Sequence, residues 1–220
     1  MRVVIAGGHG KIARLLERRL AERGDRAAGL IRNPDHRAGV EAAGGEAVVC
    51  DLESAGVEEV AKLLEGADAV VFAAGAGPGS GAARKDTVDK GASVLMAEAA
   101  ERTGVRRFVQ ISSIGAGAPP EEGTDEVWAA YIAAKTAAED DLRGRDLDWT
   151  ILRPGGLTDA PATGRVLLAQ PPVPRGAVPR DDVAAVVVAL LDEPRTAGMT
   201  LELVGGEAPI AAAVRALLEE

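Results

Sequence analysis

The first 23 residues, "MRVVIAGGHGKIARLLERRLAER", combine a short apolar run, a glycine-rich turn and a stretch of alternating apolar and charged residues. This order predicts a β-strand, a tight turn and an amphipathic α-helix. The turn has the spacing Gly7-x-x-Gly10-x-x-Ala13. Gly7 permits the tight turn, Gly10 lets the backbone approach a pyrophosphate closely, and Ala13 lets the helix pack against the sheet. The free N–H groups at the start of the helix favour phosphate.

This turn predicts a dinucleotide site, and we assign its cofactor contacts to Gly7, His9, Gly10, Lys11 and Ile12. The alternative is a structural strand–helix turn that binds nothing. A P-loop fits poorly, because the lysine in "GGHGKIA" is not followed by Ser or Thr and the earlier glycine of that motif is missing.

Short β-branched runs alternate with longer amphipathic stretches along the chain. Strands are expected at 2–6, 26–31, 46–50, 68–74, 106–111, 148–153 and 199–204. Helices are expected at roughly 11–23, 35–43, 56–65, 84–103, 127–143, 181–192 and 208–219. Such alternation implies parallel pairing through βαβ units. The sequence therefore predicts one α/β domain over 1–220, a doubly wound, mostly parallel Rossmann-type sheet of about seven strands with helices on both faces.

Three segments rich in glycine or proline interrupt this alternation, at 75–83, 115–126 and 158–182. Each follows the carboxyl end of an expected strand, which is the edge where open α/β sheets bind ligands. They are either flexible connections or the walls of a site for a small-molecule substrate. We expect residues 158–220 to contribute the substrate side.

Composition limits the partners. The net charge of −9 argues against a nucleic-acid surface, which needs a basic face. The single cysteine, Cys50, excludes an intrachain disulfide, and the two histidines give no metal-site spacing. No apolar run reaches the ~20 residues that a membrane span needs. We expect a soluble cytoplasmic protein, monomeric or homodimeric, that binds no nucleic acid, membrane or metal.

The end of the second strand indicates which dinucleotide is bound. An NAD site usually carries Asp or Glu there, whereas "LIRNPDHR" places Arg32 at that position. A cation favours a 2′-phosphate, so we expect NADP rather than NAD, with Arg37 or Lys11 as further sources of charge. The alternative is a solvated surface arginine.

Two further strand ends fit the same site. Asp51 and Leu52 follow the third strand, where an acid and an apolar side chain can border an adenine. Ala73, Ala74 and Gly75 follow the fourth strand, where small residues let the backbone pass beside a cofactor. Either segment alone could be an ordinary turn.

The only tyrosine of the chain, Tyr131, stands four residues before Lys135 in "VWAAYIAAKTAAED". On a helix this spacing places both side chains on one face. A nearby ammonium stabilises a phenolate, so this pair could give a proton to a carbonyl or take one from an alcohol. Ser112 or Ser113, at the end of the fifth strand, could hydrogen-bond the substrate oxygen. The alternative is a tyrosine that only packs against a loop.

These motifs, together with "RPGGLTD" and "PRDDVAAVVVALL", resemble the short-chain dehydrogenase/reductase superfamily, and in particular its atypical branch of small NAD(P)H-binding, epimerase-like proteins. The resemblance covers nearly the whole chain. It implies that Ser113 is the catalytic serine, Tyr131 the acid/base, and Lys135 its electrostatic and ribose-binding partner. An asparagine of the superfamily is matched here by Asp89, a departure that bears on any water-mediated proton relay.

The resemblance also implies that Pro154, Gly155 and Leu157 approach the nicotinamide. Three functions are compatible with these residues. The first is an NADP-dependent oxidoreductase acting on a small carbonyl or alcohol. The second is a non-catalytic NADP-binding sensor or regulator, and the third an NAD(P)-dependent epimerase or isomerase.

Overall fold

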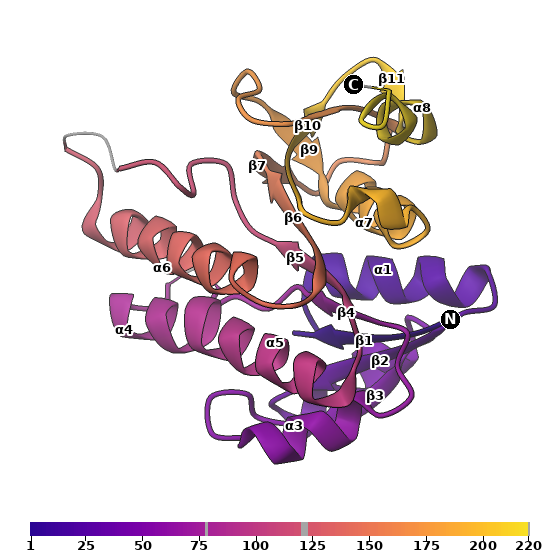
Figure 1. Ribbon diagram of the computed structural model, residues 1–220, viewed down its shortest axis with the longest axis vertical. Helices are drawn as coiled ribbons and strands as arrows, with labels where there is room; N and C mark the ends of the chain where they lie inside the picture. The colour runs from indigo at the N-terminus through magenta and orange to yellow at the C-terminus, as the bar shows by residue number, and fades with distance from the viewer. Residues whose placement is uncertain (78, 120–122, 220) are drawn as a thin grey trace.

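A nine-stranded sheet in the order β11-β8-β10-β6-β5-β4-β1-β2-β3 runs through the molecule (Figure 1). The computed structural model describes residues 1–77, 79–119 and 123–219. Pairing is parallel from β3 to β10, and β8 runs antiparallel to β10 and β11. The strands of this sheet are β1 (Arg2–Ala6), β2 (Arg26–Ile31), β3 (Glu46–Val49), β4 (Ala69–Phe72), β5 (Arg107–Ile111), β6 (Asp148–Pro154), β8 (Arg165–Ala169), β10 (Met199–Gly205) and β11 (Ala208–Pro209). The predicted doubly wound, mostly parallel α/β fold is confirmed, with nine strands instead of about seven.

Helices cover both faces of the sheet. In Figure 1, α1 and α7 lie side by side on one face, and α3, α5 and α6 lie on the other. The α-helices are α1 (Lys11–Glu22), α2 (Arg37–Glu41), α3 (Val57–Leu64), α4 (Ala82–Arg84), α5 (Ala92–Thr103), α6 (Glu126–Arg143), α7 (Arg180–Leu191) and α8 (Ile210–Ala216). Short 3-10 turns occupy Pro34–His36 and Pro194–Thr196. Within the described ranges, none of the helices is long and apolar enough to cross a membrane.

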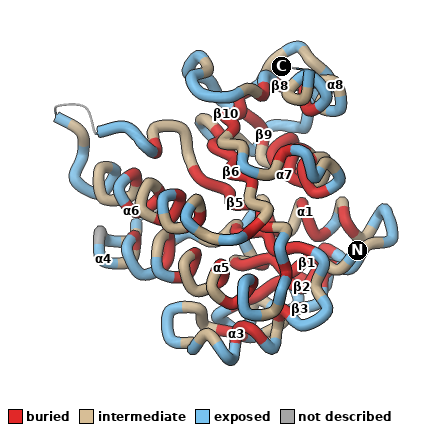
Figure 2. Tube along the Cα trace, in the orientation of Figure 1, coloured by how far each residue is buried: buried red, intermediate tan, exposed pale blue. Residues whose placement is uncertain are grey.

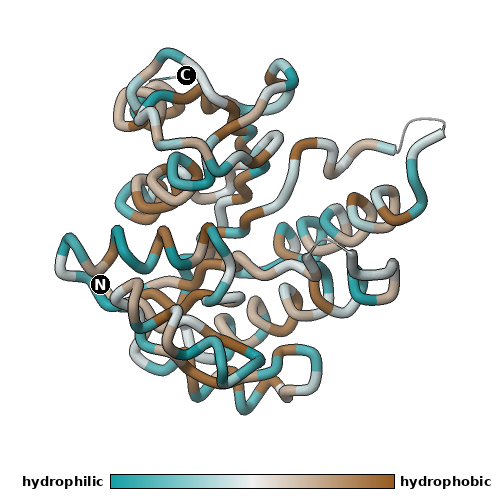
Figure 3. The backbone as a smooth tube through the Cα atoms, turned by 180° about the vertical axis from the view of Figure 1, so that it is seen from behind, coloured by the Kyte–Doolittle hydropathy of each residue, from teal (hydrophilic) through white to brown (hydrophobic). Residues whose placement is uncertain are grey.

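The core forms two layers because successive strand residues point to opposite faces. In β1, Val3 and Ile5 pack with α1 and α7, whereas Val4 and Ala6 pack with α3 and α5. Figure 2 shows the buried residues concentrated along the central strands and the inner sides of the helices. In Figure 3 the tube of α1 alternates between hydrophobic and hydrophilic residues, as a helix with one buried side must. Both faces of β1 are therefore buried, which explains its continuous apolar run.

The segment 158–182, which interrupts the expected alternation of strands and helices, is not one continuous loop. This segment contains β8, which joins the main sheet, and β9 (Ala177–Pro179). β9 pairs in parallel with β7 (Gly156–Thr158) to form a separate two-stranded sheet. In β8 the buried residues Val166 and Leu168 alternate with more exposed neighbours, the pattern of an antiparallel strand with one covered face. The glycines and prolines around these short strands obscured that pattern.

The expected helix over 84–103 is interrupted by a π-helical segment at Lys85–Gly91. Lys85, Val88 and Asp89 of this segment are all buried. The Asp89 carboxylate accepts a hydrogen bond from the Ala76 N–H at 3.1 Å. Wide turns of this kind are frequent at functional sites, and this one turns two charged side chains inward.

Glu17 is a buried carboxyl group on α1. It is fully buried, and neither of its carboxyl oxygens has a hydrogen-bond partner among the described residues. A Cβ atom on Gly29 of β2 would come 2.4 Å from Oε1 of Glu17, so the carboxyl group packs directly against this strand position. Burial raises the pKa of Glu17 to about 8, although the charge of Arg14 opposes the shift. The protonated acid is therefore the resident form at neutral pH.

This raised pKa predicts a pH-dependent stability. Between about pH 4.5 and pH 8 the folded chain holds a proton on Glu17 that the unfolded chain has released, so stability falls as pH rises through this window. Glu17→Gln carries no such proton. We therefore expect the free energy of unfolding of Glu17→Gln, minus that of the wild type, to rise by about 2–3 kcal/mol between pH 5.5 and pH 7.5. Urea denaturation at both pH values measures this. The matched control is Glu22→Gln, an exposed position on the same helix, and an equal change in both variants would contradict the assignment.

Candidate active site and cofactor groove

Three adjoining hollows follow the carboxyl ends of the parallel strands. The glycine-loop hollow, of about 300 Å³, is lined by residues that include Gly7, Arg32 and Asp51. The central hollow, of about 570 Å³, contains Lys135 and Asp89. The outer hollow, of about 710 Å³, contains Ser113 and Arg180.

Shared residues join these hollows into one groove. Ala73, Ala74 and Gly75 line both the glycine-loop hollow and the central hollow. Tyr131, together with Trp128, Pro154 and Leu157, lines both the central hollow and the outer hollow. The groove therefore runs from the glycine turn, past the tyrosine, to the C-terminal part of the chain.

The glycine turn has the shape that a pyrophosphate needs. Gly7 has a φ of +80°, and a Cβ atom on it would lie 2.7 Å from the Cα atom of Ala74. Gly10 caps α1 with no side-chain hydrogen bond in the described chain, and the first turn carries no acidic residue. The N–H groups at the start of the helix are thus left for an anion.

Two arginines share one carboxylate at the rim of the glycine-loop hollow. Arg32 Nη1 lies 2.7 Å and Arg84 Nη2 lies 2.6 Å from Glu53 Oε2. Hydrogen bonds from Arg84 and then from Thr87 lower the pKa of Glu53, which keeps that carboxylate ionised. Asp51 lines the same hollow, so two arginines and two carboxylates meet there. The sequence pointed to Arg32, but it missed Arg84, which comes from the segment after β4.

Two histidines, His9 and His36, also line this hollow. The rings of His9 and His36 are stacked, with their centroids 3.8 Å apart. Burial, followed by the charges of His36 and Arg14, lowers the pKa of His9, so its ring is neutral at pH 7. The structure places Leu52 and Cys50 in the same hollow, and burial raises the pKa of Cys50 to about 11, which leaves an unreactive thiol.

Arg37 and Lys11, which the sequence suggested as further sources of positive charge beside Arg32, do not line the glycine-loop hollow. Arg37 donates to the Ala47 carbonyl at 3.0 Å and does not line the glycine-loop hollow. Lys11 pairs with Asp159 at 2.6 Å. The neighbouring residue of Lys11, Ile12, does reach the central hollow.

Lys135 is held beside the lone tyrosine. Its Nζ lies 3.3 Å from Oδ1 of Asp89, donates to the Ile111 carbonyl at 3.2 Å, and lies 5.7 Å from the centroid of the Tyr131 ring. Lys85 Nζ lies 5.2 Å from the same centroid. The structure thus brings Tyr131, Lys135 and Asp89 together, and adds a second ammonium that the sequence did not indicate.

The two serines after β5 have different surroundings. Ser112 is buried, and its hydroxyl donates to Oε1 of Glu139 at 2.5 Å. Ser113 is partly exposed in the outer hollow, where its hydroxyl donates to the Ile114 carbonyl at 3.2 Å. Tyr131 lines the same hollow, so Ser113 is the serine that a ligand there can reach.

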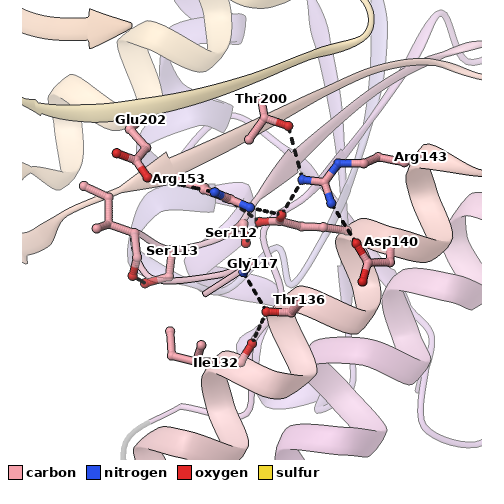
Figure 4. A network of polar contacts seen from close by, with 12 residues as sticks. Ser112, Ser113, Gly117, Ile132, Thr136, Asp140, Arg143, Arg153, Thr200 and Glu202 are labelled. Carbon is pink, nitrogen blue, oxygen red and sulfur yellow. Dashed lines mark hydrogen bonds and ion pairs between the residues drawn. The ribbon is translucent and has the colours of Figure 1, made fainter. Parts of the chain in front are cut away.

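Glu139 is a buried ionic centre beneath these residues. Its carboxylate accepts bonds from Nε and Nη2 of Arg153 at 2.9 and 2.5 Å, and pairs with Arg143 at 2.7 Å. Ser112, Arg143 and Arg153 all contact this carboxylate, and Figure 4 shows these three side chains gathered at the same place. Because Arg153 precedes Pro154, Glu139 ties α6 to the ends of β5 and β6. Glu139 follows Tyr131 and Lys135 at intervals of four, and this spacing could have identified it.

Residues after β6 complete the groove. Pro154 and Leu157 line the central and outer hollows, whereas Gly155 lines only the outer hollow. A Cβ atom on Gly155 would come 2.4 Å from the Gly176 carbonyl oxygen, so this segment packs tightly against the chain before β9. No cluster of three or more His, Cys, Asp or Glu side chains in the described part of the chain could hold a metal ion.

Comparison with known proteins identifies the family. A family model described as NAD(P)H-binding matches residues 7–194. The chain belongs to the NAD(P)H-binding family. The predicted membership among small NAD(P)H-binding, epimerase-like proteins is confirmed.

Individual relatives agree with this membership. The chain is 36% identical to Bacillus subtilis YhfK, described as an uncharacterized sugar epimerase, over 99% of this chain and 100% of that protein. It is similar to the oxidoreductase ylbE from Lactococcus lactis, with a TM-score of 0.86, 27% identity, and coverage of 100% and 98%. It is also similar to the anaerobilin reductase ChuY from Escherichia coli O157:H7, with a TM-score of 0.78, 26% identity, and coverage of 93% and 97%.

The Glu139 centre predicts a loss of stability. Glu139→Gln leaves Arg153 buried with only Glu202, at 3.9 Å, as a carboxylate partner. Because an uncompensated buried charge is costly, we expect the free energy of unfolding to fall by about 3 kcal/mol in urea denaturation. Asp140→Asn is the matched control, since this exposed neighbour pairs with Arg143 and should cost under about 1 kcal/mol. A loss for Glu139→Gln as small as that of the control would refute the role.

Proposed function

We propose that this protein is an NADP-dependent oxidoreductase that acts on a small carbonyl compound or alcohol. The observation that carries the proposal is the position of Tyr131, which lines the central hollow together with Lys135 and the outer hollow together with Ser113. In this proposal the cofactor lies along the glycine-loop and central hollows, and the substrate occupies the outer hollow, whose far side comes from residues 158–220.

The residues of the groove suit such a cofactor. The glycine turn and the N-terminus of α1 would bind the pyrophosphate, while Asp51 and Leu52 would border the adenosine. Arg32 and Arg84 would bind a 2′-phosphate, because Glu53 holds both guanidinium groups at the hollow and each keeps further N–H donors for a ligand. Pro154 and Leu157 would lie against the nicotinamide, and the bound cofactor would supply the hydride.

Proton transfer is the part of the reaction that this chain's side chains perform. The Tyr131 hydroxyl would give a proton to the substrate oxygen during reduction, or remove one during oxidation, while the Ser113 hydroxyl donates a hydrogen bond to the same oxygen. The ammonium groups of Lys85 and Lys135 lie 5.2 and 5.7 Å from the centroid of the Tyr131 ring, so two positive charges stand beside the phenol. Asp89 orients Lys135 and leaves a third N–H of that ammonium for a ribose hydroxyl.

A second candidate is an epimerase that oxidises and re-reduces its substrate on a retained cofactor, which the description of YhfK favours. It would use the same Tyr131, Lys135 and Ser113. No net consumption of NADPH, with cofactor retained through purification, would distinguish it. A non-catalytic sensor is less well supported, because Tyr131 faces two hollows instead of solvent alone.

Cofactor preference tests the arginine pair. We expect Arg32→Ala to weaken NADPH binding about tenfold and NADH binding less than about twofold, because the variant removes a charge-assisted contact to the 2′-phosphate. Fluorescence titration measures both affinities. Arg37→Ala is the matched control, since Arg37 lies outside the glycine-loop hollow and should change neither. An equal loss for both nucleotides with Arg32→Ala would argue against NADP.

Removing the phenol hydroxyl tests the chemistry. We expect Tyr131→Phe to lower the single-turnover hydride-transfer rate by about 10²–10⁴-fold with NADPH affinity unchanged, because general acid–base catalysis contributes about that much. Stopped-flow absorbance across a panel of aldehydes, ketones and alcohols measures the rate. Trp128→Phe, a change to another aromatic ring in the same two hollows, should stay within about tenfold of wild type. Absence of turnover in the wild type despite tight NADPH binding would contradict the oxidoreductase.

A further inference from the structure

Aromatic side chains are scarce in this chain, and two of them meet in the groove. The sequence has two phenylalanines, two tryptophans and one tyrosine. Phe72 and Phe108 are fully buried in the core, and Trp149 packs against the same core. The other two, Trp128 and Tyr131, both line the central hollow and the outer hollow. The aromatic rings that the core does not use are therefore gathered where the proposed substrate lies.

Trp128 presents its indole ring at the surface of these hollows. It is 50% exposed, and Val127 and Leu157, which line the central hollow with it, are 42% and 38% exposed. Large apolar side chains gathered at a hollow favour an apolar ligand, because the ligand removes them from water when it binds. The exposed side of the groove is thus suited to a hydrophobic group.

The first turn of α6 holds the indole beside the tyrosine. The Asp125 carboxylate caps this helix and accepts hydrogen bonds from the N–H groups of Val127 and Trp128, both at 3.0 Å. Tyr131 follows Trp128 by three residues, so both side chains lie on one face of the helix, and their ring centroids are 5.2 Å apart. The indole is therefore fixed one helical turn from the phenol that transfers the proton in the proposed reaction.

The two rings differ in what already contacts them. The ammonium groups of Lys85 and Lys135 lie over the ring of Tyr131, which is only partly exposed. Trp128 is the more exposed of the two rings. Aromatic rings stack in offset arrangements, and an exposed indole is a favourable surface for a flat aromatic ligand. Trp128 is thus the ring on which such a ligand would stack.

The outer hollow sets the size of the ligand and the place of its polar end. Its volume of about 710 Å³ lies within the range of small-molecule sites. Ser113 and Tyr131, whose hydroxyls would contact the substrate oxygen, line this hollow together with Trp128. One molecule can therefore stack a flat ring on the indole and direct an oxygen attached to that ring toward the two hydroxyls.

We propose that the substrate is an aromatic carbonyl compound or alcohol, and that its ring stacks on Trp128. The identity of this ligand as a substrate rests on the proposed oxidoreductase function. The stacking site itself does not, so binding and turnover are measured separately.

Binding is measured by calorimetric titration of the NADP-loaded protein with benzamide and with cyclohexanecarboxamide. Both amides are uncharged and carry the same carbonyl group on a six-membered ring, but only the ring of benzamide is flat and aromatic. A site that selects any apolar group would bind both equally, whereas aromatic stacking contributes about three- to tenfold in affinity. We expect benzamide to bind more tightly by that factor. Equal or tighter binding of cyclohexanecarboxamide, or binding of neither amide, would overturn the inference.

Two variants at one position assign this preference to the indole. Trp128→Leu removes the ring and keeps an apolar side chain, so it should weaken benzamide binding about three- to tenfold and cyclohexanecarboxamide binding less than about twofold. Trp128→Phe keeps a ring and should keep the preference for benzamide. Leu167→Ala is the control, because Leu167 is an exposed apolar residue outside the central and outer hollows. An undiminished preference for benzamide in Trp128→Leu would place the ligand elsewhere and overturn the inference.

Fluorescence locates the bound ring independently. In Trp149→Phe the remaining tryptophan is Trp128, so the emission reports on this indole alone. Saturating benzamide should lower the quenching constant for acrylamide by about twofold or more, because a stacked ring covers the exposed indole. An unchanged quenching constant with benzamide bound would contradict the stacking.

Turnover separates this inference from the function on which it rests. Benzaldehyde and cyclohexanecarbaldehyde differ in intrinsic reactivity, so the ratio of their kcat/KM values is compared between wild type and Trp128→Leu. We expect the variant to lower the ratio, benzaldehyde over cyclohexanecarbaldehyde, by about three- to tenfold. An unchanged ratio, with both aldehydes turned over, would refute the aromatic substrate and keep the oxidoreductase. Benzamide binding that depends on Trp128, without turnover of any carbonyl compound, would refute the oxidoreductase and keep the stacking site.

Discussion

The strands β1 to β6 are paired in parallel, so the loops that follow them all leave the sheet at the same edge. Six segments crowd that edge, and the crowding decides which side chains it can hold. A Cβ atom on Gly7 would lie 2.7 Å from the Cα of Ala74, and one on Gly8 would lie 2.5 Å from the Cα of Gly29. Glycine at these two positions thus allows the loop after β1 to approach the segment after β4 and the strand β2 closely.

Charge at this edge follows a repeated arrangement in which two cations share one carboxylate. Glu53 is shared by Arg32 and Arg84, Asp159 by Lys11 and Arg180, and Glu139 by Arg143 and Arg153. Each carboxylate holds two cations in place. A chain with a net charge of −9 can in this way hold cationic side chains at defined positions, as with Arg32 and Arg84 beside the glycine-loop hollow. Where the set is buried, as at Glu139, it also fixes α6 against the sheet.

The features that could be predicted from the sequence are those that depend on a local pattern of residues. The glycine turn, the parallel strands and the i, i+4 pair of Tyr131 and Lys135 each depend on spacing within a few residues, and the structure has them at the expected positions. The short strands β7, β8 and β9 were missed because a segment rich in glycine and proline does not reveal pairings with distant strands. Arg84 and Arg180 were missed for a related reason. Their roles arise from long-range contacts, such as Arg84 with Glu53, that no short motif contains.

The central and outer hollows have a common wall, which Tyr131, Pro154 and Leu157 belong to. A nicotinamide ring against Pro154 and Leu157 would become part of the floor on which the second reactant rests. A molecule that reached the outer hollow first would meet an incomplete surface and bind weakly. We therefore expect a compulsory order of addition, in which the nucleotide enters before its co-reactant and departs after the product.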